Sequence, residues 1–181
     1  MKNVVINVDE NIKLKSWQPD SAAELFALVD KNRDYLLPWF PWVPFIKEVK
    51  NSQDFINSSL KEMENNLGLE LGIWYQDKLV GCIGLHDFNL TNKRASIGYW
   101  LDKDHQGKGI MTKSVKALIN FCFSELNLNR LAILTSTINS HSYSIAERLG
   151  FKKEGIIRQY EFINDHFSDC YQYSFLKFEN N

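Results

Sequence analysis

The chain changes its hydrophobic period abruptly near residue 106, and this change limits the possible folds more than any other feature. Residues 95–101 alternate, so that Ala95, Ile97, Tyr99 and Leu101 would share one face of a β-strand. From residue 111 onward the apolar side chains follow helical spacing, in a stripe formed by Met111, Val115, Leu118, Ile119, Cys122 and Leu126. A strand, a loop containing Gly107 and Gly109, and a helix N-terminus therefore follow one another along the chain.

This junction predicts a site for an anion. Free backbone N–H groups and the positive end of the helix dipole converge at a helix N-terminus, so a pyrophosphate is a natural ligand there. Gly107 and Gly109 would let the backbone approach phosphate oxygens closely, and Lys108 would add a positive charge. A tight turn that binds nothing is an equally good explanation of two glycines. The segment matches neither GxxxxGK[ST] nor GxGxxG, which argues against a nucleotide hydrolase.

The remaining segments predict an α/β (α+β) architecture in a single domain over residues 1–181. Two helices are expected before residue 70, one beginning at Pro19-Asp20-Ser21 and one carrying Phe55 to Leu67. A short helix over residues 140–149 should end at Gly150. Besides one strand near the N-terminus, strands are expected at residues 70–75, 78–85, 95–101, 131–135, 151–160 and 170–178, with a hairpin turn at Gln76-Asp77. Helices interleaved with these strands would cover the faces of a mixed sheet.

Composition and charge exclude several classes of function. The 21 basic and 22 acidic residues leave a formal net charge of -1, which gives no overall attraction to nucleic acid or to an anionic membrane. No segment reaches the roughly 18 apolar residues of a membrane span, so we expect a cytoplasmic protein. The cysteines Cys82, Cys122 and Cys170 and the histidines show no paired ligand spacing. Reduced thiols and no metal site are therefore expected.

Two blocks of sequence resemble the GNAT superfamily of N-acetyltransferases. The first is Ile97-Gly98-Tyr99-Trp100-Leu101 followed by Gln106-Gly107-Lys108-Gly109-Ile110-Met111-Thr112, which is similar to the acetyl-CoA motif [QR]-x-x-G-x-[GA] except for Met111. The second contains Asn139-Ser140-His141-Ser142 and then Ile145 to Phe151. The resemblance implies a GNAT fold with a mostly antiparallel central sheet, and the RimL/RimJ branch, which acetylates protein N-termini, is the most similar. It covers residues 70–178 well and the N-terminal third by element order only.

The resemblance also implies which residues hold acetyl-CoA. The pyrophosphate would lie at Gln106, Gly107, Lys108, Gly109, Ile110 and Met111, and pantetheine amides would enter a gap between a splayed strand carrying Tyr99, Trp100 and Leu101 and its parallel neighbour over residues 131–135. Asn139 would donate a hydrogen bond to the cofactor, although asparagine is also a preferred helix N-cap.

Two residues would perform the chemistry in the RimL-type pattern. Ser142 would donate a hydrogen bond to the leaving thiolate, because Ala146 stands where many relatives have a tyrosine. Capping of its own helix is the alternative role of Ser142. Tyr143 is the second candidate for the thiolate hydrogen bond. Glu161 would act as general base, with an exposed strand carboxylate as the alternative, and Ser96 replaces an acidic residue common in relatives. An α-amino group with pKa about 7.7–8.0 is partly neutral already, so positioning should carry much of the acceleration.

The resemblance implies that the aromatic segment from Tyr35 to Phe45 walls the acceptor site, with Trp39 and Trp42 as substrate contacts. A satellite core or a dimer contact is the alternative. The expected acceptor is a protein N-terminal α-amino group. A polyamine, amino sugar or amino acid is the nearest rival, and a protein that binds acyl-CoA without catalysis is a second class. The resemblance also implies a homodimer.

Overall fold

The computed structural model describes residues 3–180, and its strands form an eight-stranded sheet in the order β1-β2-β3-β4-β5-β6-β8-β7. Neighbouring strands are antiparallel except for the parallel pair β5 and β6. The strands are β1 (Val5–Asn7), β2 (Ile12–Ser16), β3 (Leu69–Tyr75), β4 (Lys78–Asn89), β5 (Arg94–Leu101), β6 (Arg130–Ser136), β7 (Lys152–Ile163) and β8 (His166–Leu176). The predicted mixed, mostly antiparallel sheet is confirmed.

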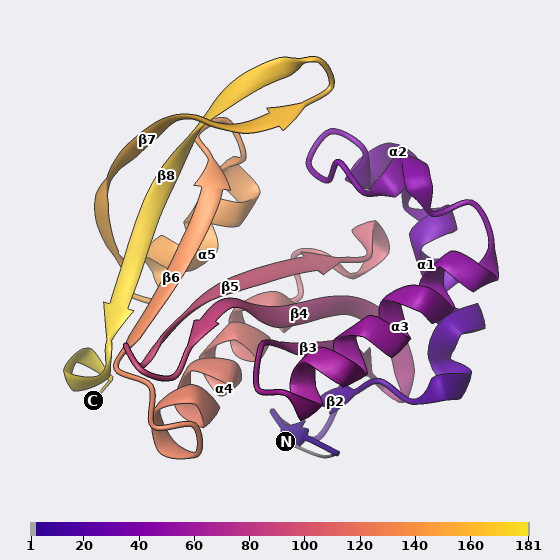
Figure 1. Cartoon of the computed structure of the whole chain (residues 1–181), viewed down its shortest axis with the longest axis horizontal. Helices are drawn as coiled ribbons and strands as arrows, with labels where there is room; N and C mark the ends of the chain where they lie inside the picture. Colours follow the sequence, from indigo (N-terminus) through magenta and orange to yellow (C-terminus); the bar gives the residue numbers. More distant parts are fainter. Residues whose placement is uncertain (1–2, 181) are drawn as a thin grey trace.

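Helices cover both faces of the sheet, as the interleaved pattern predicted (Figure 1). They are α1 (Ala22–Lys31), α2 (Arg33–Leu36), α3 (Val49–Glu64), α4 (Ile110–Ser124) and α5 (Ser140–Arg148). On one face Ile83 packs in a core with Val115 and Leu118 of α4. On the other face Cys82 packs with Leu25 of α1 and Ile56 of α3. None of the helices within residues 3–180 is long and apolar enough to cross a lipid bilayer.

The sheet opens between β5 and β6, the splayed pair that the resemblance implied. The two strands pair only where Arg94, Ala95 and Ser96 face residues 130–132. Beyond that point β5 continues to Leu101 and β6 to Ser136, and Figure 1 shows them diverging into a V with α5 beside β6. Backbone groups on the facing edges of the V have no ladder partner across the gap, so they can bind an extended ligand.

Two of the predicted segments differ from the structure. The N-terminal region forms a hairpin of two strands rather than one strand, because the Asp9 carboxylate accepts hydrogen bonds from the backbone N–H groups of Asn11 and Ile12 and turns the chain. At the other end, β7 and β8 extend through residues 161–169, which were expected to be a connection. Asn164 and Asp165, both with positive φ, form a two-residue hairpin turn there.

Candidate active site

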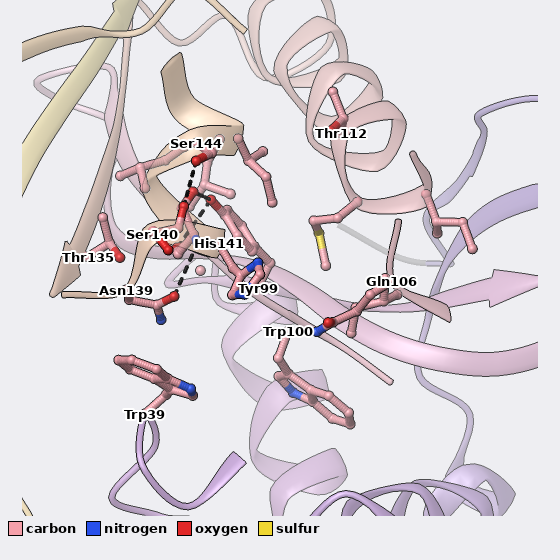
Figure 2. A pocket seen from close by; sticks show the side chains of 18 of the residues that line it. Trp39, Tyr99, Trp100, Gln106, Thr112, Thr135, Asn139, Ser140, His141 and Ser144 are labelled. Atoms are coloured by element: carbon pink, nitrogen blue, oxygen red, sulfur yellow. Dashed lines mark hydrogen bonds between the residues drawn. The ribbon is translucent and has the colours of Figure 1, made fainter. Parts of the chain in front are cut away.

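A cavity of about 790 Å³ occupies the gap between β5 and β6 (Figure 2). Its wall comes from five parts of the chain: the segment around α2, strand β5, the start of α4 with its preceding loop, the end of β6 together with α5, and one residue of β7. The lining residues include Tyr35, Trp39, Phe40, Tyr99, Trp100, Leu101, His105, Gln106, Gly107, Gly109, Ile110, Met111, Asn139, His141, Ser142, Arg148 and Glu161. Segments that are distant in sequence therefore meet in one cavity.

The loop before α4 has the backbone geometry expected of an anion site. Gly107 and Gly109 adopt left-handed φ values of 72° and 74°, and Gly109 is the N-cap of α4. The N–H groups in the first turn of α4 have no partner inside the helix. Met111, the departure from the [QR]-x-x-G-x-[GA] pattern, is buried in the core cluster and also lines the cavity. Lys108 is exposed and is not among the described residues that line the cavity.

Side chains from α1 and α2 hold this loop in place. Asp102, only 1% exposed, accepts hydrogen bonds from Lys31 Nζ at 2.9 Å and lies 2.7 Å from His105 Nδ1. Burial raises the pKa of the Asp102 carboxyl, but hydrogen bonds from Lys31, Asn32 and His105 outweigh it and hold the pKa below its usual value. The Gln106 amide donates to the Tyr35 hydroxyl. Sequence reasoning missed these contacts, since Lys31 and Asp102 lie 71 residues apart.

The start of α5 presents Asn139 and Ser142 to the cavity. Asn139 Oδ1 accepts a hydrogen bond from the Ser142 N–H at 3.2 Å, so Asn139 is the N-cap, while Figure 2 shows its amide directed toward the open space near Trp39. The Ser142 hydroxyl donates to the Tyr99 hydroxyl at 3.4 Å, and Tyr99 donates to the Ser142 carbonyl at 3.0 Å. Burial raises the pKa of Tyr99 to about 12. Ser142 therefore faces the cavity instead of capping its helix.

Tyr143, the reserve candidate, lies elsewhere. Its ring packs edge-on against Tyr171 at 5.6 Å, and it is not among the described residues that line the cavity. Of the two candidates, Ser142 thus lies in the cavity wall, whereas Tyr143 does not belong to the described lining.

A bulge in β7 brings Glu161 to the cavity. Between Ile157 and Glu161 the register shifts, and Gln159 has a φ of 50° with its N–H donated to the Asp169 carboxylate at 2.8 Å. Such a bulge bends the strand and redirects side chains. Glu161 also lies beside Cys170: burial, and then the Glu161 carboxylate, raise the pKa of this thiol to about 12. Cys170 is thus a neutral buried neighbour of Glu161.

The two predicted acceptor tryptophans occupy different positions. Trp39 lines the cavity, and Figure 2 shows it facing Asn139 and Trp100 across the open space. Trp42 does not belong to the described lining; its ring packs against Phe40 at 5.4 Å and against Trp100 at 6.3 Å between centroids. Trp42 therefore supports two lining rings from behind. Sequence alone could not separate two tryptophans three positions apart.

Comparisons with known proteins show the family to which this chain belongs. Residues 11–152 match the acetyltransferase (GNAT) domain family. The chain is 30% identical over 169 residues to the ribosomal-protein-serine acetyltransferase of Escherichia coli, covering 93% of this chain and 94% of that protein.

The chain belongs to the GNAT acetyltransferase family.

Solved structures agree with this assignment. One is the ribosomal-protein α-N-acetyltransferase RimL in complex with coenzyme A, with a TM-score of 0.93 and 25% identity, covering 96% of this chain and 98% of that chain. Another is the microcin self-immunity acetyltransferase MccE in complex with acetyl-CoA and AMP, with a TM-score of 0.90 and 30% identity, covering 93% and 94%. The protein is an acetyl-CoA-dependent N-acetyltransferase, which agrees with the sequence prediction.

The residues of this acetyltransferase fit acetyl-CoA as co-substrate. The cavity joins a helix N-terminus with two left-handed glycines to a stretch of β5 that has no described partner across the gap, and backbone groups of these kinds can bind a phosphate and an amide chain. Acetyl-CoA supplies an activated acetyl group as a thioester. No group of three or more His, Cys, Asp or Glu side chains within residues 3–180 is arranged to hold a metal ion.

Proposed function

We propose that this acetyltransferase transfers the acetyl group to the α-amino group at a protein N-terminus. One observation carries the choice of acceptor: Glu161 is the single carboxylate among the described residues that line the cavity. A polyamine carries several ammonium groups, and a site for it would need several carboxylates. An N-terminus carries one α-amino group, followed by an uncharged backbone and side chains that suit an aromatic wall.

The predicted site residues then take the following roles. The backbone of Gln106, Gly107, Gly109, Ile110 and Met111 holds the pyrophosphate, and exposed Lys108 contributes its charge from outside the cavity. Tyr99, Trp100 and Leu101 offer the free edge of β5 to the pantetheine amides, and the Asn139 amide donates to the same arm.

At the reacting centre, Glu161 accepts a proton from the attacking amine and Ser142 donates a hydrogen bond to the leaving thiolate. Trp39 contacts the acceptor, while Trp42 supports Trp100. An α-amine needs little activation, so the main work of the site is to align amine and thioester.

Two further features belong to this proposal. We place the protein in the cytoplasm, where ribosomal proteins are made.

We also propose a homodimer, which is supported by the apolar surface of β7. On this edge strand of the sheet the side chains of Ile156, Tyr160 and Phe162 are 55%, 52% and 55% exposed. Light scattering across a concentration series tests the dimer, and a monomer at all concentrations would refute it.

The acceptor is tested with acetyl-CoA and a panel of short peptides, spermidine, an aminoglycoside and free amino acids, analysed by mass spectrometry. We expect acetylation of peptides with free N-termini and none of the same peptides with blocked N-termini. Preferred acetylation of spermidine or the aminoglycoside would favour the small-amine alternative. Tight acetyl-CoA binding without transfer to any acceptor would favour the non-catalytic binding protein.

A further inference from the structure

Arg148 is a cationic residue of the cavity wall that has no role in the reaction proposed above. It is the last residue of α5, it is exposed, and it lines the cavity. Its Nη1 atom donates a hydrogen bond to the Thr112 hydroxyl at 3.0 Å. Thr112 lies in the first turn of α4 and lines the cavity as well. The guanidinium therefore bridges α5 and α4 close to the loop proposed above for the pyrophosphate.

The Arg148 guanidinium has no anionic partner within residues 3–180. Arg33 and Arg130 form ion pairs there, whereas Arg148 forms none. The adjacent carboxylate, Glu147, accepts a hydrogen bond from the Tyr173 hydroxyl at 2.9 Å instead. An arginine side chain carries five N–H donors, and in Arg148 only Nη1 has a described partner. Most of its donors and its positive charge are thus available to a ligand in the cavity.

The other lysine of the described lining differs from Arg148 in this respect. Lys113 lines the cavity, but its ammonium group forms an ion pair with Asp9 at 2.7 Å. Glu161, the carboxylate of the described lining, belongs to β7 rather than to α4 or α5. Arg148 is therefore the one Lys or Arg side chain of the described lining that lacks an acidic partner.

The face of α5 that leads to Arg148 carries small side chains. Ser140 and Ser144 precede Arg148 at intervals of four residues, so all three share one face of the helix. Both serines line the cavity, and Figure 2 shows them on α5, with Thr112 on α4. A ligand held at the loop before α4 can therefore extend along this face as far as the guanidinium.

The chemistry of CoA supplies an anion for this position. CoA carries a pyrophosphate and, on its ribose, a separate 3′-phosphate monoester. Because an α-helix rises about 1.5 Å per residue, Thr112 lies about 4.5 Å beyond the Gly109 N-cap along the axis of α4. Arg148 thus offers its charge nearly one helical turn from the pyrophosphate site, and the ribose separates the two phosphate groups of CoA. A guanidinium fork matches the oxygens of a phosphate monoester in a bidentate arrangement.

We propose that Arg148 binds the 3′-phosphate of CoA and makes the enzyme select CoA over dephospho-CoA, with Thr112 orienting the guanidinium. The proposal rests on acetyl-CoA as co-substrate and on the pyrophosphate site proposed at the loop before α4. It does not depend on the identity of the acceptor amine.

A structural role is the alternative for Arg148. A cation at the C-terminal end of a helix interacts favourably with the helix dipole, and the hydrogen bond to Thr112 joins α5 to α4. Such a role would affect the stability of the fold. It would not distinguish two ligands that differ only in the 3′-phosphate.

The test compares the affinities of CoA and dephospho-CoA, measured by titration calorimetry. Wild type should bind CoA roughly 5- to 30-fold more tightly than dephospho-CoA. Arg148→Gln should reduce this ratio to about two or less and leave the affinity for dephospho-CoA nearly unchanged. Arg148→Lys should keep part of the ratio, because the charge remains but the fork is lost.

Two further variants complete the series. Thr112→Val keeps the backbone N–H and the branched shape but loses the hydroxyl that orients Arg148, so the ratio should fall about two- to threefold. Lys116→Gln is the control: it removes an exposed charge from α4 outside the described lining, and the ratio should stay at the wild-type value. If Arg148→Gln does not fold, Arg148→Lys and Thr112→Val still decide the question.

Phosphorus-31 NMR of bound CoA gives a second readout. A phosphate monoester loses its last proton with a pKa of about 6, and a guanidinium beside it should lower that pKa. The 3′-phosphate signal should therefore titrate at lower pH in the complex with wild type than in free CoA. In the complex with Arg148→Gln it should titrate as in free CoA, whereas the pyrophosphate signals should be the same in both complexes.

Three results would overturn the assignment. Equal affinity of wild type for CoA and dephospho-CoA would show that the 3′-phosphate is not recognised. Equal weakening of both ligands by Arg148→Gln would show that Arg148 contacts the pyrophosphate instead. A less stable Arg148→Gln fold with an unchanged ratio would assign a structural role. Failure of the pyrophosphate site itself would be seen differently, as unchanged CoA affinity in a folded Gly109→Val variant.

Discussion

Replacement of Ser142 by alanine tests which group stabilises the leaving thiolate. Ser142 lines the cavity, and its hydroxyl donates to the Tyr99 hydroxyl over 3.4 Å, a long and weak hydrogen bond. Turning that hydroxyl toward a thiolate therefore costs little. Hydrogen bonds to charged groups contribute about 1.5–3 kcal/mol, and each 1.36 kcal/mol changes a rate tenfold. Ser142→Ala should then lower kcat by about 10- to 150-fold.

The assay is steady-state turnover of acetyl-CoA with an N-terminal peptide, together with calorimetric measurement of CoA affinity. CoA affinity should change little, because the hydrogen bond strengthens only as the thiolate forms. Tyr143→Phe is the matched control: its ring packs on Tyr171 outside the cavity, so kcat should stay within about twofold of wild type. A Ser142→Ala enzyme with wild-type kcat, or a large loss in Tyr143→Phe, would refute the assignment.

Four further predictions test other parts of the site and fold. Gly109→Val places a β-branched residue at a φ of 74° and should weaken CoA binding, measured by calorimetry, at least about tenfold. The control Gly155→Val, at a position equally free of neighbours but without a positive φ, should leave CoA affinity unchanged. Unchanged CoA affinity in a folded Gly109→Val variant would show that the pyrophosphate does not bind at this loop. Glu161→Gln should lower kcat by about 100-fold or less, with a defect that grows as pH falls from 9 to 6, and a rise in KM alone would make Glu161 a binding contact. Cys82→Ala, Cys122→Ala and Cys170→Ala should each keep turnover if they fold, because these buried thiols are not needed for direct transfer; an acetyl-cysteine intermediate in mass spectrometry would contradict this. The Arg130 guanidinium, with help from Ser174 and Gln172 and against the effect of burial, lowers the pKa of Glu154 to about 2, so Glu154 should stabilise the fold above pH 4.5 and lose that effect as the pH falls toward 2. The Glu154 side chain is 38% exposed, and after discounting for this we expect Glu154→Gln to lower the free energy of unfolding in urea by about 1–1.5 kcal/mol at pH 7. An equal loss at pH 2.5 would contradict the ion pair as its source.

Local signals in the sequence were sufficient for most of the fold. The period change at residue 106, the turn at Gln76-Asp77 and the left-handed cap at Gly150 depend on a few adjacent residues, and the structure confirms all three. The turn at Asn164-Asp165 has the same kind of signal as Gln76-Asp77 and could have been identified. Its omission hid the second half of the β7–β8 hairpin.

The environment of the site was harder to predict because it depends on distant pairs. Nothing near Lys31 in the chain indicates that it contacts Asp102, and nothing near Arg148 indicates that it donates to Thr112 on another helix. The sequence names both tryptophans of the aromatic segment, but only packing against Trp100 places Trp42 behind the cavity wall. The sequence thus identified several of the site residues, but the directions of their side chains and their contact partners depend on how the strands pair in the sheet.

The bulge in β7 limits which changes of chain length this family member tolerates. Between the paired positions Ile157–Cys170 and Glu161–Ser168, β7 advances by four residues and β8 by two, so β7 holds two extra residues. Because two is an even number, the side chains of β7 point to the same alternating faces of the hairpin before and after the bulge. Deleting one residue among positions 158–160 would turn the Glu161 side chain to the opposite face of the hairpin, whereas removing two would keep its face but straighten the strand. Evolutionary insertions and deletions here should therefore come in pairs, and an alignment of relatives should show gaps of even length at this point.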